Sequence, residues 1–199
     1  MNIILGGALT NNQVYDIYNE YIIETYQNID MQSNEHYKDL TELIYNKHFK
    51  DKSYDLVIGH SMGGLIILDI LCRNLEIKCK KIVIVESYIF EPSKEFRNIV
   101  YKNIHLEQKL NNVMRNEVEK YNSKIFDSLR KLNIVEDLKD ISRTLLFVYG
   151  MRDLDNDTFL QKLDFPNLQN VRLIGIPQTS HFCLIEKPTE FLKKILNDD

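Results

Sequence analysis

The fold of this 199-residue chain is decided by the stretch Tyr54-Asp55-Leu56-Val57-Ile58-Gly59-His60-Ser61-Met62-Gly63. Its short run of Leu, Val and Ile, without polar alternation, is typical of a strand buried on both faces of a parallel sheet. Soon after the glycine-bracketed serine, residues 65–70 read Leu-Ile-Ile-Leu-Asp-Ile, which is a helix-like pattern. The stretch therefore predicts a tight strand-turn-helix unit with Ser61 at the turn.

Strand-like and helix-like segments alternate along the rest of the chain. Further apolar runs predict strands at residues 3–5, 82–85, 145–149 and 171–176, with a weaker one at 22–25. Amphipathic stretches predict helices at 11–21, 33–48, 62–74 and 188–196. This alternation predicts an α/β fold, with a mostly parallel sheet of about six strands flanked by helices, in a single domain over residues 1–199.

One region, residues 91–140, interrupts the alternation. About fifty residues pass there without a clear strand, while apolar residues recur at helical spacing, as at Leu106, Leu110, Val113 and Val118. Either this helical insertion merely covers the sheet or it also forms a lid. Because ligands of open α/β sheets bind beyond the carboxyl ends of the strands, we expect a helical lid.

The composition of the chain indicates which binding partners and which cellular compartment to expect. The 25 Lys and Arg residues are scattered among 29 Asp and Glu, for a net charge of −4, which does not favour nucleic acid as a partner. Three cysteines, Cys72, Cys79 and Cys183, leave one unpaired after any disulfide, which favours a reducing compartment. No stretch reaches the roughly 18 apolar residues of a membrane span, and the amino terminus lacks a signal-peptide pattern. We therefore expect a cytoplasmic protein with no membrane span.

The pattern Gly59-x-Ser61-x-Gly63 gives the turn a chemical meaning. Side chains two positions before and after Ser61 are expected to collide in so tight a turn, and glycines relieve this crowding. The serine hydroxyl is then held outward, and the helix that follows favours negative charge beside it. An ordinary turn capped by serine would also fit. The flanking strand and helix favour a nucleophile.

A serine hydroxyl needs a general base, and histidine is the natural one. The five candidates are His36, His48, His60, His105 and His181. Only His181 is expected on a loop beyond the carboxyl end of a strand, after residues 171–176. We predict that His181 is the base and that the other four are surface or satisfied core residues.

The base needs a carboxylate that fixes its tautomer. Asp153 comes just past the predicted strand 145–149, from where it can reach the loop of the next strand. Asp155 and Asp157 are better explained as a helix cap and a first-turn charge. A calcium loop is not predicted, because this acidic cluster lacks the glycine and distal glutamate. We expect no metal ion and no cofactor.

Two backbone N–H groups should bind the oxyanion of the reaction. Met62 directly follows the nucleophile and supplies one. The glycine-rich bend Leu5-Gly6-Gly7-Ala8 after the first strand should supply the other. Ala8 is the first choice and Gly7 the alternative. The bend matches neither glycine-rich nucleotide-binding pattern, so no nucleotide is implied.

Together these residues resemble the α/β-hydrolase superfamily, and within it the lid-bearing esterase and thioesterase branch. The resemblance is carried by residues 59–64, 150–153 and 180–188 with Phe191, in the chain order Ser, Asp, His. It covers most of the chain outside residues 91–140. The two strands that usually precede the oxyanion loop look missing, which implies a minimal member. A serine rather than an aspartate in the turn argues against the branches that work through an aspartyl ester.

These residues predict a serine hydrolase that cleaves a carboxylic ester or thioester through an acyl-enzyme. Residues 91–140 carry ten Lys and Arg against nine Asp and Glu. A mildly basic lid would suit an acyl group on an acyl carrier protein or coenzyme A, although a solvated helix face explains the same charges. Two alternatives stay open: an acyltransferase with the same triad, and a non-catalytic binding protein with a relic triad.

Overall fold

The structure of the chain is a computed structural model that describes residues 1–8, 10–25, 37–89, 134–152 and 154–198. Its strands are β1 (Asn2–Leu5), β2 (Ile22–Glu24), β3 (Ser53–His60), β4 (Lys78–Val85), β5 (Leu145–Arg152) and β6 (Val171–Pro177). The described helices are η1 (Asn12–Tyr18), α1 (Tyr37–Ile44), η3 (Tyr45–Phe49), α2 (Met62–Cys72), α6 (Val135–Lys139), α7 (Asn156–Leu163), α8 (Cys183–Glu186) and α9 (Pro188–Asn197). Every predicted strand is present, including the weak one that forms β2.

The six strands form one parallel sheet in the order β2-β1-β3-β4-β5-β6. The predicted α/β class and sheet size are therefore confirmed. The chain runs outward from β1 to β2 and then returns to place β3 on the other side of β1. Ligands of such sheets bind beyond the carboxyl ends of the two strands at this reversal. Gly6 follows β1 and Ser61 follows β3, so the topology brings the glycine-rich bend beside the serine turn.

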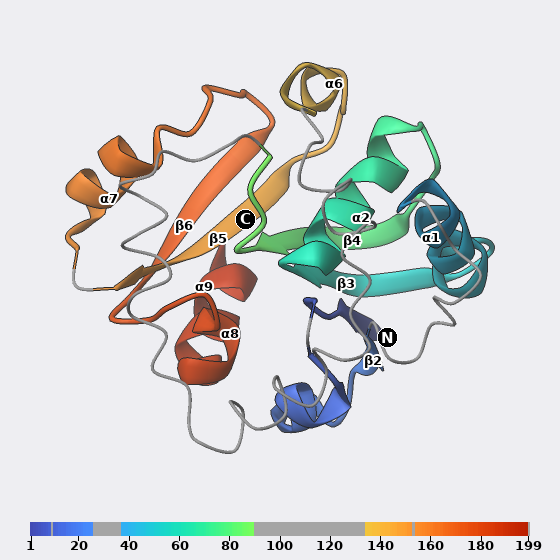
Figure 1. The fold of residues 1–199 in the computed structure, drawn as a ribbon, viewed down its shortest axis with the longest axis horizontal. Helices are drawn as coiled ribbons and strands as arrows, with labels where there is room; N and C mark the ends of the chain where they lie inside the picture. The colour runs from blue at the N-terminus through green and yellow to red at the C-terminus, as the bar shows by residue number, and fades with distance from the viewer. Residues whose placement is uncertain (9, 26–36, 90–133, 153, 199) are drawn as a thin grey trace.

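Apolar side chains of the strands alternate between the two faces of the sheet, and each face has its own core. Helices α1, α2 and α6 lie on one side of the sheet, and α8 and α9 lie on the other (Figure 1). In β5, for example, Phe147 belongs to the core under α1, α2 and α6, while Val148 belongs to the core under η1, α8 and α9. Both side chains are fully buried. Full burial on both faces explains why residues 145–148 of β5 form an unbroken apolar run.

The predicted helices appear with shifted ends. The segment 11–21 forms a 3₁₀ helix, η1, and within 33–48 the structure describes α1 and the π-helical turn η3. Most of the predicted insertion and lid, residues 91–140, lies outside the described residues. Its described end includes α6, whose Leu138 is buried in the core under α2. Among the described helices, none is long and apolar enough to cross a membrane.

The carboxyl edge of the sheet carries a series of residues with left-handed backbone. Ser61, Glu86, Arg152 and Gln178 have φ between 50° and 56°, and each ends or directly follows one of the strands β3 to β6. Non-glycine residues adopt this region uncommonly, and such strain clusters where a fold positions functional groups. The strained residues therefore indicate a functional site at the carboxyl edge of the sheet.

Candidate active site

Ser61 lies at the turn between β3 and α2, as the sequence predicts, with φ 54° and ψ −114°. The backbone is tied down on both sides. The Ser61 N–H donates to the Val85 carbonyl at 2.7 Å, and the Ser87 hydroxyl donates to the Ser61 carbonyl at 2.7 Å. The Ser61 side chain makes no capping hydrogen bond to α2. The strained turn therefore presents a hydroxyl that the helix does not use.

The glycines around Ser61 are needed, but for contacts other than the predicted one. A Cβ on Gly59 would lie 2.5 Å from the Cα of Gly64, not against Gly63. A Cβ on Gly63 would lie 2.2 Å from the Leu5 carbonyl oxygen. Distances below 3 Å to backbone leave no room for a side chain. Gly63 thus lets α2 approach the end of β1, which brings the bend after β1 to the serine.

That bend, Gly6 to Ala8, lies against Ser61. A Cβ on Gly7 would be 3.2 Å from the Ser61 Cβ. The Gly7 N–H is already engaged, because it donates to the Tyr15 hydroxyl at 2.9 Å. Gly7 is therefore not available as an oxyanion donor, and of the two predicted candidates Ala8 remains. Met62 is the first residue of α2, where the N–H has no acceptor within the helix.

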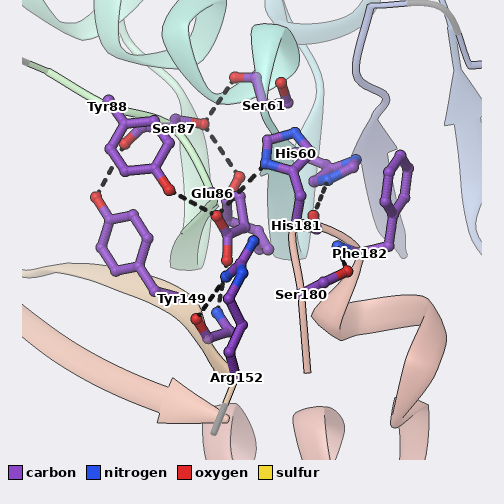
Figure 2. A network of polar contacts seen from close by, with 12 residues as sticks. His60, Ser61, Glu86, Ser87, Tyr88, Tyr149, Arg152, Ser180, His181 and Phe182 are labelled. Carbon is purple, nitrogen blue, oxygen red and sulfur yellow. Dashed lines mark hydrogen bonds and ion pairs between the residues drawn. The ribbon is translucent and has the colours of Figure 1, made fainter. Parts of the chain in front are cut away.

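His181 lies beyond β6, and its loop is fixed by several polar contacts. The Ser180 N–H donates to the Glu186 carboxylate at 3.0 Å, and the Ser180 hydroxyl also contacts that carboxylate. Phe182 is buried in the core under α8 and α9. The His181 side chain is 14% exposed. In Figure 2 its ring points toward Ser61, which is the placement that a base for this serine requires.

His60 connects the loop of His181 to the bend after β1. Its Nε2 lies 2.8 Å from the His181 carbonyl oxygen, and its Nδ1 lies 2.8 Å from the Tyr15 hydroxyl. Because a carbonyl only accepts, Nε2 carries the proton and Tyr15 donates to Nδ1. Tyr15 in turn accepts the N–H of Gly7. One fully buried histidine therefore holds both loops, and the prediction that His60 is a satisfied core residue is confirmed.

His60 makes stability sensitive to acid. Burial, and after it the charge of His181, lowers the pKa of His60 from 6.5 to about 3. Below pH 6.5 the unfolded chain binds a proton at this position that the folded chain does not, so the free energy of unfolding falls as the pH falls. At roughly 1.4 kcal/mol per pKa unit, we expect this loss to be on the order of 3 kcal/mol at pH 4.

Urea unfolding between pH 7 and pH 4 tests this expectation. Wild type should lose stability more steeply than His60→Gln, whose amide can donate to the His181 carbonyl but does not titrate. The comparison also removes the acid dependence that both proteins share, such as that of Asp55, whose pKa is lowered to about 2 by hydrogen bonds from Lys80 and the amino terminus. Equal slopes for the two proteins would contradict the role of His60.

Glu86 is a carboxylate at the site that sequence reasoning missed. It directly follows β4, is 1% exposed, and its Oε2 lies 3.4 Å from His181 Nδ1. The predicted acid, Asp153, lies outside the described residues. The signal for Glu86 was present in the sequence, because a lone charge directly follows the apolar run 82–85. Asp153 was selected on a similar ground, namely that it comes just past the predicted strand 145–149.

The remaining predicted residues have ordinary structural roles where the structure describes them. Asp155 caps α7 by accepting the Thr158 N–H at 2.9 Å, and Asp157 lies in the first turn, as predicted. His48 is buried against Glu24, as expected of a satisfied core histidine. His36 and His105 lie outside the described residues. No group of three metal-ligating side chains occurs in the described part of the chain.

Comparisons with known proteins give a consistent picture of the fold. The sequence matches no protein-family model and no curated protein. A solved carboxylesterase from the thaumarchaeon Nitrososphaera gargenis has a TM-score of 0.69 at 14% identity, over 98% of this chain and 88% of its own. MenH from S. aureus has a TM-score of 0.66 at 18% identity, over 98% and 91%. Carboxylesterase CesB (YbfK) from Bacillus subtilis has a TM-score of 0.66 at 14% identity, over 98% and 82%.

At such identities the likeness is one of fold. It covers nearly the whole chain and agrees with the parallel sheet flanked by helices. The chain therefore has the α/β-hydrolase fold.

Proposed function

We propose that this protein is a serine hydrolase that cleaves a carboxylic ester or thioester through an acyl-enzyme. The observation that carries the proposal is the left-handed turn at Ser61, with φ 54°, against the bend that follows β1. Such a turn raises a serine hydroxyl at the edge of the sheet, next to backbone N–H groups from two loops. The structural relatives include carboxylesterases, which supports ester hydrolysis in general.

In the proposed reaction the Ser61 Oγ attacks the acyl carbon while His181 Nε2 accepts the hydroxyl proton. The N–H groups of Met62 and Ala8 stabilise the negative charge that develops on the acyl oxygen. The proton then passes from His181 to the leaving alcohol or thiol, and the acyl group stays on Ser61. Water, deprotonated by His181, attacks this ester, releases the carboxylic acid and restores the serine. Asp153 is the sequence-based candidate for the carboxylate that orients His181.

The first test is covalent labelling with a fluorophosphonate probe, which reacts with activated serines. We expect wild type to be labelled and Ser61→Ala to be unlabelled. Ser53→Ala is the matched control, because Ser53 is an exposed serine at the start of the same strand and should leave labelling unchanged. Absence of label on wild type, or equal label on Ser61→Ala, would overturn the proposal.

The acyl group and the leaving group are tested by a panel of p-nitrophenyl esters and acyl thioesters of graded chain length. We expect a carboxylic acid product that appears at the same rate as the released leaving group. Adding an alcohol or amine acceptor separates hydrolysis from acyl transfer, because only a transferase would divert the acyl group into a new ester or amide. A coenzyme A or carrier-protein thioester that is turned over faster than every simple ester would support the carrier-linked substrate.

A further inference from the structure

We propose that Glu86, at the end of β4, is the positioning residue whose carboxylate orients His181. This inference rests on the proposed function and deepens it, since it assigns the third member of the triad to a residue that the sequence analysis did not select. Figure 2 shows the His181 ring between Ser61 and Glu86, with the Nδ1 side of the ring toward the carboxylate. In a serine triad, the ring nitrogen that faces away from the serine is the one that the carboxylate holds.

The Glu86 side chain is fixed from two directions. Its Oε1 accepts the N–H of Gly150 at 2.6 Å, and its Oε2 accepts the hydroxyl of Tyr88 at 2.9 Å. Both partners donate, so the carboxylate acts as an acceptor throughout, as an ionised carboxylate does. The Glu86 backbone is constrained as well. Its N–H donates to the Val148 carbonyl at 2.9 Å, and its φ is 51°. The carboxylate is therefore held in place before any substrate binds.

Oε2 still has the capacity to accept a hydrogen bond from His181 Nδ1. A carboxylate offers about four lone-pair sites, and the Gly150 and Tyr88 bonds use two of them. The 3.4 Å between Oε2 and His181 Nδ1 is about half an ångström longer than a charge-assisted hydrogen bond. Among the described residues, no acceptor lies within hydrogen-bonding geometry of Nδ1. A small rotation of the His181 ring would complete the bond.

Burial makes the charge of Glu86 effective. The side chain is fully buried, so its interaction with a protonated His181 ring is little screened by water. Among the described residues, further titratable groups near His181 include His60 from β3, which burial keeps neutral, and Arg152 at the end of β5. The predicted acid Asp153 follows Arg152 directly. Glu86 and Asp153 are thus two candidates for one role, and Glu86 is a candidate that the described structure places beside His181 Nδ1.

The test compares Glu86→Gln and Asp153→Asn, each of which removes a charge with little change of shape. We expect Glu86→Gln to lower kcat for the best ester by at least about 100-fold, with KM within about threefold of wild type. We also expect the acidic limb of its kcat/KM profile to move to lower pH by about one unit, because an anion no longer favours the protonated imidazole. Asp153→Asn should lower kcat by less than about tenfold and leave the limb in place.

Tyr88→Phe is the matched control, since it removes a hydrogen bond to the same Oε2 without changing the charge. We expect it to leave the acidic limb unmoved. An unmoved limb in Glu86→Gln, or a larger loss with a moved limb in Asp153→Asn, would overturn the proposal. A loss of folding in Glu86→Gln would be seen in its urea unfolding curve. In that case Glu86→Asp, which keeps the charge, is the variant to measure. An acidic limb at the wild-type pH in Glu86→Asp supports the proposal, and a displaced limb overturns it.

A readout that does not need turnover separates this inference from the proposed function. The His181 ring resonances can be followed by NMR as the pH is changed. Titration at lower pH in Glu86→Gln than in wild type would support the pairing even if the fluorophosphonate failed to label the protein. Identical titration in the two proteins would overturn the pairing even if labelling succeeded.

Discussion

Alanine at position 61 should abolish esterase activity, with kcat/KM lower than that of wild type by about 10⁴-fold or more. The physical reason is that the substitution removes the atom that forms the acyl-enzyme and leaves the rest of the site in place. The Ser61 hydroxyl makes no capping hydrogen bond to α2, and alanine keeps the Cβ at the strained backbone. We therefore expect the free energy of unfolding to change by less than about 0.5 kcal/mol. Initial rates on the best p-nitrophenyl ester, together with urea unfolding, measure both effects.

Two results would contradict this interpretation of Ser61. One is a variant that keeps more than about a tenth of wild-type activity. The other is a Ser61→Ala protein that loses activity only because it no longer folds. Ser53→Ala provides the reference for both measurements, since it removes a hydroxyl from the exposed start of the same strand.

Removal of the imidazole in His181→Ala should lower kcat by about 10³-fold to 10⁵-fold. Without a base, Ser61 must lose its proton to water, and the leaving group must depart without a proton donor. The side chain is 14% exposed, so its removal leaves a site that small molecules can reach. We expect added imidazole to restore part of the activity of His181→Ala. Stopped-flow or steady-state rates on the same ester measure the loss and the recovery.

The matched control for the base is His48→Gln, which changes a second buried histidine whose ring contacts the Glu24 carboxylate. Its partner Glu24 has a lowered pKa because hydrogen bonds from His48 and Lys47 outweigh the effect of burial. We expect His48→Gln to lose stability and to keep kcat within about threefold of wild type. Similar losses of kcat in the two histidine variants would mean that His181 acts through folding rather than as the base.

The sequence was sufficient to predict the sheet and the positions that depend on a single strand. The structure buries the predicted apolar runs at the centre of the sheet, as at Val57 and Phe147, because a parallel strand covered on both faces leaves no place for polar residues. The edge strands β2 and β6 are only partly buried. Ser61 and His181 could be selected for the same reason, since each follows a strand on the edge where parallel strands end together.

Contacts between distant strands could not be predicted in this way. Whether His181 meets Glu86 or Asp153 depends on how β4, β5 and β6 align, and both carboxylates satisfy the rule of following a strand. The contact of Tyr15 with His60 joins a 3₁₀ helix to the end of β3 across 45 positions of sequence. The glycine contacts differ from prediction because Gly63 faces Leu5, on a neighbouring strand, instead of Gly59 on its own turn.

The left-handed backbone of Ser61 makes serine a costly residue at this position. A side chain held at φ 54° and ψ −114° costs about 1–3 kcal/mol, a sizeable part of the roughly 5–15 kcal/mol by which a domain of this kind is stable. Glycine would relieve that strain, and the Ser61 hydroxyl does not compensate for it by capping α2. Selection for folding alone would therefore replace this serine. The strained serine therefore supports the proposed role of a reactive hydroxyl over the alternative of a binding protein with a relic triad.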